Sequence, residues 1–209
     1  MTPEHADQKL RHWLLTLLAF GSASVSLLAL VLHAMNWLPL YFLVDIVAAP
    51  SLVLLLVLGV IAYRIQEPVF LSRLLTGSWV GLVATGAYDL IRFLLRASGI
   101  ISFDPFLSHP VFGRLITGLP ETTQTAVVVG WAYHFWNGFG LGLMYTLLLG
   151  NVRWYYAMVW ATLLEFAWLV TLPSVLQLKV SPAFIVVGFI GHAAYGAVLG
   201  VLVERFAKA

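Results

Sequence analysis

The sequence lacks cysteine and carries few charged residues. The absence of cysteine excludes disulfides, thiolate metal ligands, iron–sulfur clusters and thiol catalysis, and it leaves the redox compartment undetermined. Charged residues make up 10% of the 209 residues, against about a quarter in a soluble domain. The 11 basic residues form no run that could follow a phosphate backbone, so we expect no nucleic-acid partner.

Several catalytic motifs are missing as well. The sequence has neither the G-x-S-G nor the G-x-G-D pattern of intramembrane serine and aspartyl proteases, and it has no phosphate-binding glycine-rich loop. It also has no H-x-x-x-H pair. Any chemistry must therefore come from residues that lie far apart in the sequence.

Apolar residues dominate the chain, with 61% hydrophobic residues and a mean hydropathy of +0.95. Such a composition suits lipid as the solvent, and a helix needs about 20 residues to cross a bilayer. We therefore predict an all-α fold, with residues 1–209 forming a single polytopic domain embedded in the lipid bilayer. Six segments have spanning length, and they cover residues 13–34, 39–64, 74–97, 123–149, 153–173 and 182–205.

Basic residues in short connections predict the orientation of these segments. With the N-terminus inside, seven basic residues fall on the cytoplasmic side, and the outer side holds Arg92, Arg96, Arg114 and Lys179. This bias predicts that both termini are cytoplasmic. The first segment is longer than the core of a signal peptide, so we expect an uncleaved helix.

The longest connection, residues 98–122, is expected on the outer side. It contains the stretch FDPFLSHPVFGRLITG, which is too apolar for a solvated loop, and its prolines interrupt any single long helix. The sequence predicts a broken amphipathic segment that lies in the headgroup region. His109, next to Pro110, is interpreted as an ordinary residue of this connection.

One pattern occurs twice in register. The stretches GWAYHFWNGFGLG (130–142) and GFIGHAAYGAVLG (188–200) both have the form G-x-x-x-H-x-x-x-G-x-x-x-G. Residues four apart share a helix face, so each stretch puts three glycines and a histidine on one stripe. Small residues at this spacing let membrane helices approach closely, which explains the glycines as packing residues.

Ionisable residues occupy the same faces. Asp89, His134, Glu165 and His192 lie between mid-span and the outer third of their segments by helix counting. Such residues are costly inside a membrane and usually mark function. Asp45 is placed nearer the outer end of its segment, Arg92 follows Asp89 at the i+3 position, and Asn137 lies about one turn from His134.

Two imidazoles and two carboxylates suit zinc, iron or manganese. The leading hypothesis is therefore an intramembrane metal site with His134, His192, Glu165 and Asp89 as ligands. In this hypothesis Glu165 and Asp89 also serve as acid/base groups of a reaction on a lipid-soluble substrate, and Asn137, Asp45 and Arg92 support the ligands.

Three alternatives stay open. The two histidines could be the axial ligands of a b-type haem, although such a pocket has no need of the carboxylates. The buried acids and histidines could form the pathway of a small proton- or cation-coupled transporter, which would be a homodimer. The cluster could also be purely structural, as in a non-catalytic assembly or stability factor.

The last segment also carries a resemblance. GHAAYGAVLGVL, residues 191–202, resembles the H-x-x-Y-G-x-x-L-G helix of small YagU-type bacterial inner-membrane proteins. The likeness covers about a dozen residues. It implies a bacterial cytoplasmic membrane and no catalytic role for any residue.

Overall fold

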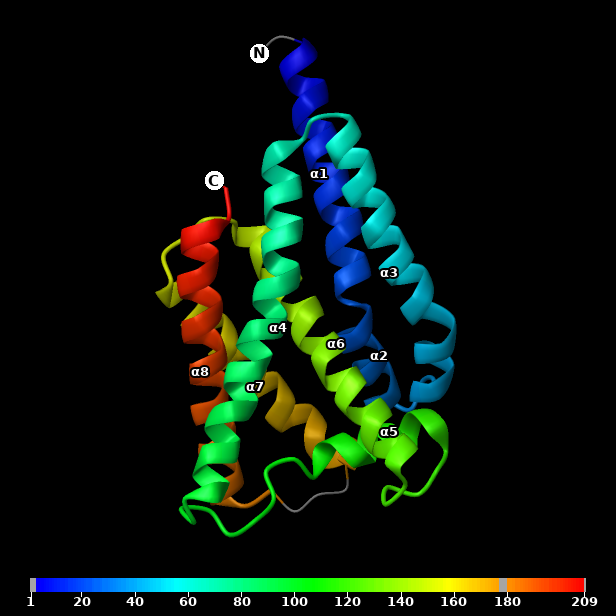
Figure 1. Cartoon of the computed structure of the whole chain (residues 1–209). Coiled ribbons are helices and arrows are strands. Elements are labelled where there is room, and N and C mark those ends of the chain that lie inside the picture. The colour runs from blue at the N-terminus through cyan, green and yellow to red at the C-terminus, as the bar shows by residue number, and fades with distance from the viewer. Residues whose placement is uncertain (1–2, 177–179, 209) are drawn as a thin grey trace.

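The computed structural model describes residues 3–176 and 180–208, and these residues form helices and connections without any strand. Lys179, one of the predicted outer basic residues, lies outside the described residues. The helices of the described ranges (Figure 1) are α1 (Pro3–Ala23), α2 (Val25–Ala34), α3 (Leu40–Arg64), α4 (Pro68–Ala97), α5 (Ser108–Thr117), α6 (Gln124–Leu149), α7 (Tyr155–Leu176) and α8 (Pro182–Phe206).

The prediction of an all-α chain with membrane-spanning segments is confirmed. Helices α3, α4 and α8 are each long and apolar enough to cross a membrane, and the bent pair α1 and α2 would make a fourth span. Helices α6 and α7 correspond to the other two predicted segments, and α7 is a shorter apolar helix over Tyr155–Thr171. Within the described residues, length and composition thus give three or four candidate spans, and the six that the sequence predicts are not confirmed.

The first predicted segment is not one straight helix. It bends by 48° between α1 and α2. At the bend, the Ser24 hydroxyl donates to the Gly21 carbonyl and the Ser22 hydroxyl donates to the Leu18 carbonyl. Serine hydroxyls that bond back to the helix backbone in this way favour bending. Gly140 of α6 packs against the Ala23 carbonyl at the same level, so the bend fits the neighbouring helix.

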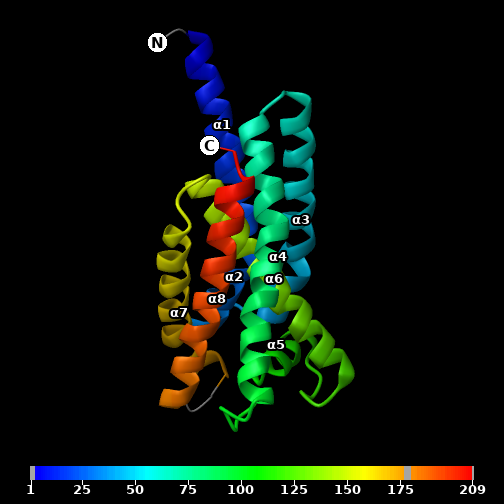
Figure 2. The same cartoon turned by 60° about the vertical axis from the view of Figure 1, so that its left-hand side comes forward.

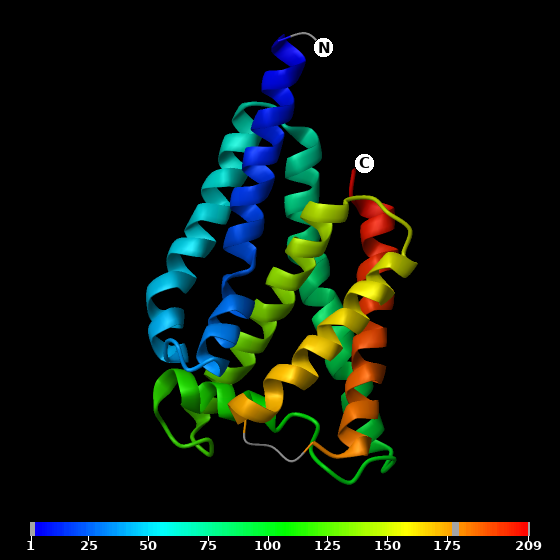
Figure 3. The same cartoon turned by 180° about the vertical axis from the view of Figure 1, so that it is seen from behind.

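With the bent pair α1 and α2 taken as one helix and α5 lying across one end, the helices run alternately up and down a single bundle (Figures 1 and 2). Both termini lie at one end, and the connections that hold α5 lie at the other. Seen from behind, α6 and α8 run in the same direction (Figure 3), as the repeated motif requires. Helix α4 packs extensively against both.

The glycine stripes pack helices together, as the sequence predicts. In α6, a side chain on Gly138 would overlap Thr85, and one on Gly142 would overlap the backbone of Gly81 in α4. In α8, side chains on Gly196 and Gly200 would meet the backbone of α7 and the residue that precedes it. The last two glycines of each motif therefore join α6 to α4 and α8 to α7.

Candidate metal centre

The buried carboxylate of Asp89 on α4 lies between an imidazole and a guanidinium. Its two oxygens are 2.9 and 3.1 Å from Nε2 of His134 on α6. Its Oδ1 is 3.5 Å from Nη1 of Arg92, which is also buried. The i,i+3 pair between Asp89 and Arg92 predicted from the sequence is therefore present, and it fixes the carboxylate opposite His134.

His109 completes this group from α5. Its side chain is buried, and its ring centroid lies 4.3 Å from that of His134 and 4.1 Å from that of Trp131. Neither ring nitrogen makes a hydrogen bond of good geometry within the described part of the chain, although the Phe106 carbonyl is near enough to act on the ring. Burial, followed by the neighbouring His134 and Arg92, lowers the pKa of His109 to about 2, against a smaller opposing effect of the Phe106 carbonyl. The ring is therefore neutral, as a metal-binding imidazole must be.

Two glycines bring α5 to this position. A side chain on Gly130 of α6 would overlap the carbonyl of His109, and one on Gly113 of α5 would overlap the carbonyl of Ala126. The two backbones are therefore in direct contact. Gly118 ends α5 in the left-handed conformation, at a φ of 72°, which turns the chain back towards α6.

The three side chains form a group that could hold a metal ion. One ligand atom from each of Asp89, His109 and His134 lies within 4.8 Å of the others. Two imidazoles and one carboxylate are a common ligand set of zinc and of non-haem iron, and they leave coordination positions open. His134 Nε2 now contacts the Asp89 carboxylate. With an ion present, this nitrogen would instead direct its lone pair at the metal, so the ion would replace the contact.

Glu165 and His192 form a second buried pair. Nδ1 of His192 on α8 lies 2.7 Å from Oε2 of Glu165 on α7 and 3.1 Å from the Gly188 carbonyl. A side chain on Gly188 would overlap the Glu165 carboxylate, so this glycine makes room for the partner of the histidine. Both acceptors face Nδ1, which must therefore carry the hydrogen, and in the neutral ring Nε2 keeps its lone pair.

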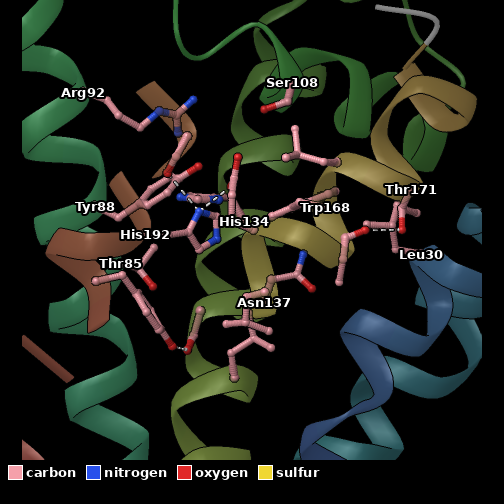
Figure 4. A pocket seen from close by; sticks show the side chains of 18 of the residues that line it. Leu30, Thr85, Tyr88, Arg92, Ser108, His134, Asn137, Trp168, Thr171 and His192 are labelled. Carbon is pink, nitrogen blue, oxygen red and sulfur yellow. Dashed lines mark hydrogen bonds and ion pairs between the residues drawn. The ribbon is translucent and has the colours of Figure 1, made fainter. Parts of the chain in front are cut away.

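Tyr88 of α4 stands between the two groups. Its ring centroid is 4.9 Å from that of His192 and 5.9 Å from that of His134. Figure 4 shows the three side chains converging on the wall of one cavity. The cavity has a volume of about 170 Å³. It is also lined by Arg92, His109, Asn137 and Glu165.

The predicted cluster therefore forms in two parts. The structure brings Asp89 together with His134, and Glu165 together with His192. His134, Glu165 and His192 line one cavity, and Asp89 lies beside it, but only the first pair belongs to the group that could hold an ion. Asn137 lines the cavity, while Asp45 is exposed on α3 and does not line it. His109 is the member of this group that the sequence interpretation missed.

Comparison of the chain with protein-family models, with curated proteins and with solved structures returns no match. Function is therefore argued from the chemistry of the site alone.

Proposed function

We propose that the chain is an integral membrane protein that binds one transition-metal ion through Asp89, His109 and His134. The observation that carries this proposal is His109, a buried imidazole whose two nitrogens are unpartnered within the described residues. A buried polar group without a partner costs about 1–3 kcal/mol. An ion held jointly with His134 and Asp89 would remove that cost.

The ligand set favours zinc or iron, with manganese as the third choice. With three protein ligands, an ion keeps at least one position for water or substrate. Water in that position becomes acidic enough to act as a nucleophile near neutral pH. The proposed class of reaction is therefore metal-assisted attack on a lipid-soluble substrate that enters the cavity.

Glu165 and His192 would supply the acid/base chemistry. Glu165 holds His192 in a defined tautomer, and His192 lines the cavity that Tyr88 shares with the metal ligands. A histidine oriented by a carboxylate is the usual arrangement of a general base. In this assignment Asp89 is a ligand and not an acid/base group, and Arg92 holds it in place.

The proposed setting is a bacterial cytoplasmic membrane with both termini inside. The positive-inside bias and the resemblance of the last helix motivate this setting, and the two termini lie at the same end of the bundle (Figure 1). The metal group lies toward the opposite end, next to α5, so it would open to the outer side of the membrane.

Metal analysis of the purified protein tests the proposal. We expect about one ion per chain after loading with zinc and removal of the excess. Asp89→Asn, His109→Phe and His134→Phe should each abolish retention. The matched control is His12→Phe, which removes a histidine near the other end of the bundle. Zinc retention unchanged in all three site variants would refute the proposal.

A proton- or cation-coupled transporter, assembled as a homodimer, is the second candidate. It is favoured by the two carboxylate–imidazole pairs that flank Tyr88, because chains of such groups carry protons through membranes. Uptake into proteoliposomes that Glu165→Gln abolishes, in protein that retains no metal, would support it. A b-type haem is less well supported, since such a pocket has no need of the carboxylates that pair with His134 and His192. The two carboxylate–imidazole pairs could also be purely structural, as in an assembly factor. That role would not explain why the two nitrogens of His109 are buried without a partner in the described residues.

A further inference from the structure

The cavity has two chemically different sides. Figure 4 shows Tyr88, Arg92 and His192 on one side and Leu30 and Trp168 on the other. The apolar side comes from α2, α5, α7 and α8, and its members include Leu27, Leu30, Phe112, Trp168 and Phe184. A cavity with one polar and one apolar side suits a ligand with a polar end and a hydrocarbon part.

The polar side offers hydrogen-bond acceptors. Nδ1 of His192 is taken by Glu165 and Gly188, so its Nε2 remains an acceptor in the neutral ring. The side-chain amide of Asn137 donates to the Tyr133 carbonyl, and its oxygen makes no hydrogen bond within the described residues. Both side chains line the cavity. The cavity lining also presents donors, from the Arg92 guanidinium and the hydroxyls of Tyr88 and Ser108. The polar end of a ligand must therefore donate as well as accept hydrogen bonds, as a hydroxyl does.

The charges around the cavity disfavour an anionic ligand. Glu165 lines the cavity, and the one buried guanidinium there, that of Arg92, is already engaged by Asp89, whose Oδ1 lies 3.5 Å from Nη1. Two buried carboxylates thus oppose one buried guanidinium. Without an ion, a carboxylate or phosphate headgroup would add a further negative charge to this surplus. Burying such a charge without a partner costs several kcal/mol. A neutral hydroxyl satisfies the free acceptors without this cost.

The cavity is sized for part of a lipid. Its room of about 170 Å³ for water-sized molecules is close to the roughly 150 Å³ of a cavity known to hold benzene. The cavity thus accommodates a headgroup and the first carbons of a chain, with the remainder extending towards the lipid.

We infer that this cavity binds the hydroxyl end of a lipid-soluble alcohol, with His192 and Asn137 accepting its hydrogen bonds. The inference goes beyond the proposed metal site, because the residues that carry it are not metal ligands. The site is defined without an ion, so it can be tested in protein from which metals have been removed.

The test uses the protein in phosphatidylcholine nanodiscs containing EDTA. The probe is decanol with a bromine on its second carbon, which stays inside the cavity with the hydroxyl, because bromine quenches the fluorescence of a nearby tryptophan. The difference in fluorescence quenching between the wild type and Trp168→Phe reports occupation of the cavity. We expect this difference to saturate with increasing probe. The matched probe is the corresponding brominated decanoic acid, which should bind at least about tenfold more weakly, equivalent to about 1.4 kcal/mol.

Two variants examine the acceptors separately. His192→Phe and Asn137→Leu should each weaken binding of the brominated decanol about tenfold, the loss expected for one buried hydrogen bond. Asn137→Leu serves as the independent test if His192→Phe, which leaves Glu165 without its partner, fails to fold. A difference signal that rises linearly with probe, or equal binding of alcohol and acid, would overturn the inference. Zinc loading and metal analysis of a second sample of the same protein, prepared without EDTA, report on the proposed metal site separately, so the two can fail independently.

Discussion

The ring of His109 packs against the ring of His134 at an angle of 60°, with the two centroids 4.3 Å apart. The two residues come from different elements, and His134 also contacts the Asp89 carboxylate. This packing destabilises the metal-free protein, since both nitrogens of His109 are buried and unpartnered in the part of the chain that the structure describes.

Replacing His109 with phenylalanine should remove zinc binding while raising the free energy of unfolding of the metal-free protein. Phenylalanine keeps the stacking on Trp131 and removes two unpartnered nitrogens, so the metal-free variant should gain about 1–3 kcal/mol in free energy of unfolding. Zinc at a hundredfold excess over its dissociation constant should stabilise the wild type by about 2.7 kcal/mol and leave the variant unchanged. Thermal unfolding in detergent, with zinc or with EDTA, measures both effects. A metal-free variant less stable than the wild type would contradict this account of His109.

Two alanine substitutions at the same position of the repeated motif should differ in effect. Gly130→Ala places a methyl group against the His109 carbonyl, so α5 must move away and zinc retention should be lost. Gly188→Ala places it against the Glu165 carboxylate instead, and zinc retention should persist. Metal analysis of the two purified variants provides the comparison. Loss of zinc from Gly188→Ala would show that the two pairs act as a single metal site.

Contact between α4 and α6 should depend on Gly142. A methyl group on this residue overlaps the backbone of Gly81, which cannot rotate away, so Gly142→Ala should lower the free energy of unfolding by about 1–3 kcal/mol or more. The control is Gly86→Ala on α4, where nothing lies within 4 Å of the added carbon. That substitution should stabilise the helix by up to about 1 kcal/mol. Unfolding curves of the two variants in the same detergent measure this difference in stability. Equal changes in the free energy of unfolding would argue against close packing of α4 and α6 at Gly142.

The orientation can be tested by labelling, because the natural chain contains no cysteine. Lys208→Cys should react with a membrane-impermeant maleimide only after the inner membrane is opened. Ser102→Cys, in the connection at the other end of the bundle, should react in intact spheroplasts. The opposite pattern would place both termini outside and would reverse the side to which the metal group opens.

The sequence predicted the helices well because apolar length and turn residues determine them. The segment predicted over 39–64 is α3 at Leu40–Arg64, and the segment over 182–205 is α8 at Pro182–Phe206. The bend in the first segment escaped prediction, since hydropathy does not register the hydroxyl contacts of Ser22 and Ser24. Helix α4 begins at Pro68 rather than at residue 74, because proline readily starts a helix.

The candidate site was only half predictable. Helix periodicity placed Asp89, His134, Glu165 and His192 on inward faces, and all four meet in the two pairs around the cavity. Periodicity does not report which faces oppose one another, so it could not separate the two pairs. His109 was missed because it lies outside any span. A signal did exist in Gly130, whose missing side chain leaves a gap one turn before His134, but the sequence alone did not show that α5 would fill it.

The three residues of the metal group come from α4, α5 and α6, which are consecutive in the chain, and the Glu165–His192 pair comes from the next two helices. A nascent chain can therefore complete the metal group once α6 has left the ribosome, before the remaining helices are made. The bound ion would then hold α4, α5 and α6 together early in synthesis of the protein. Closing of the cavity by α7 and α8 would be the last step of its biogenesis.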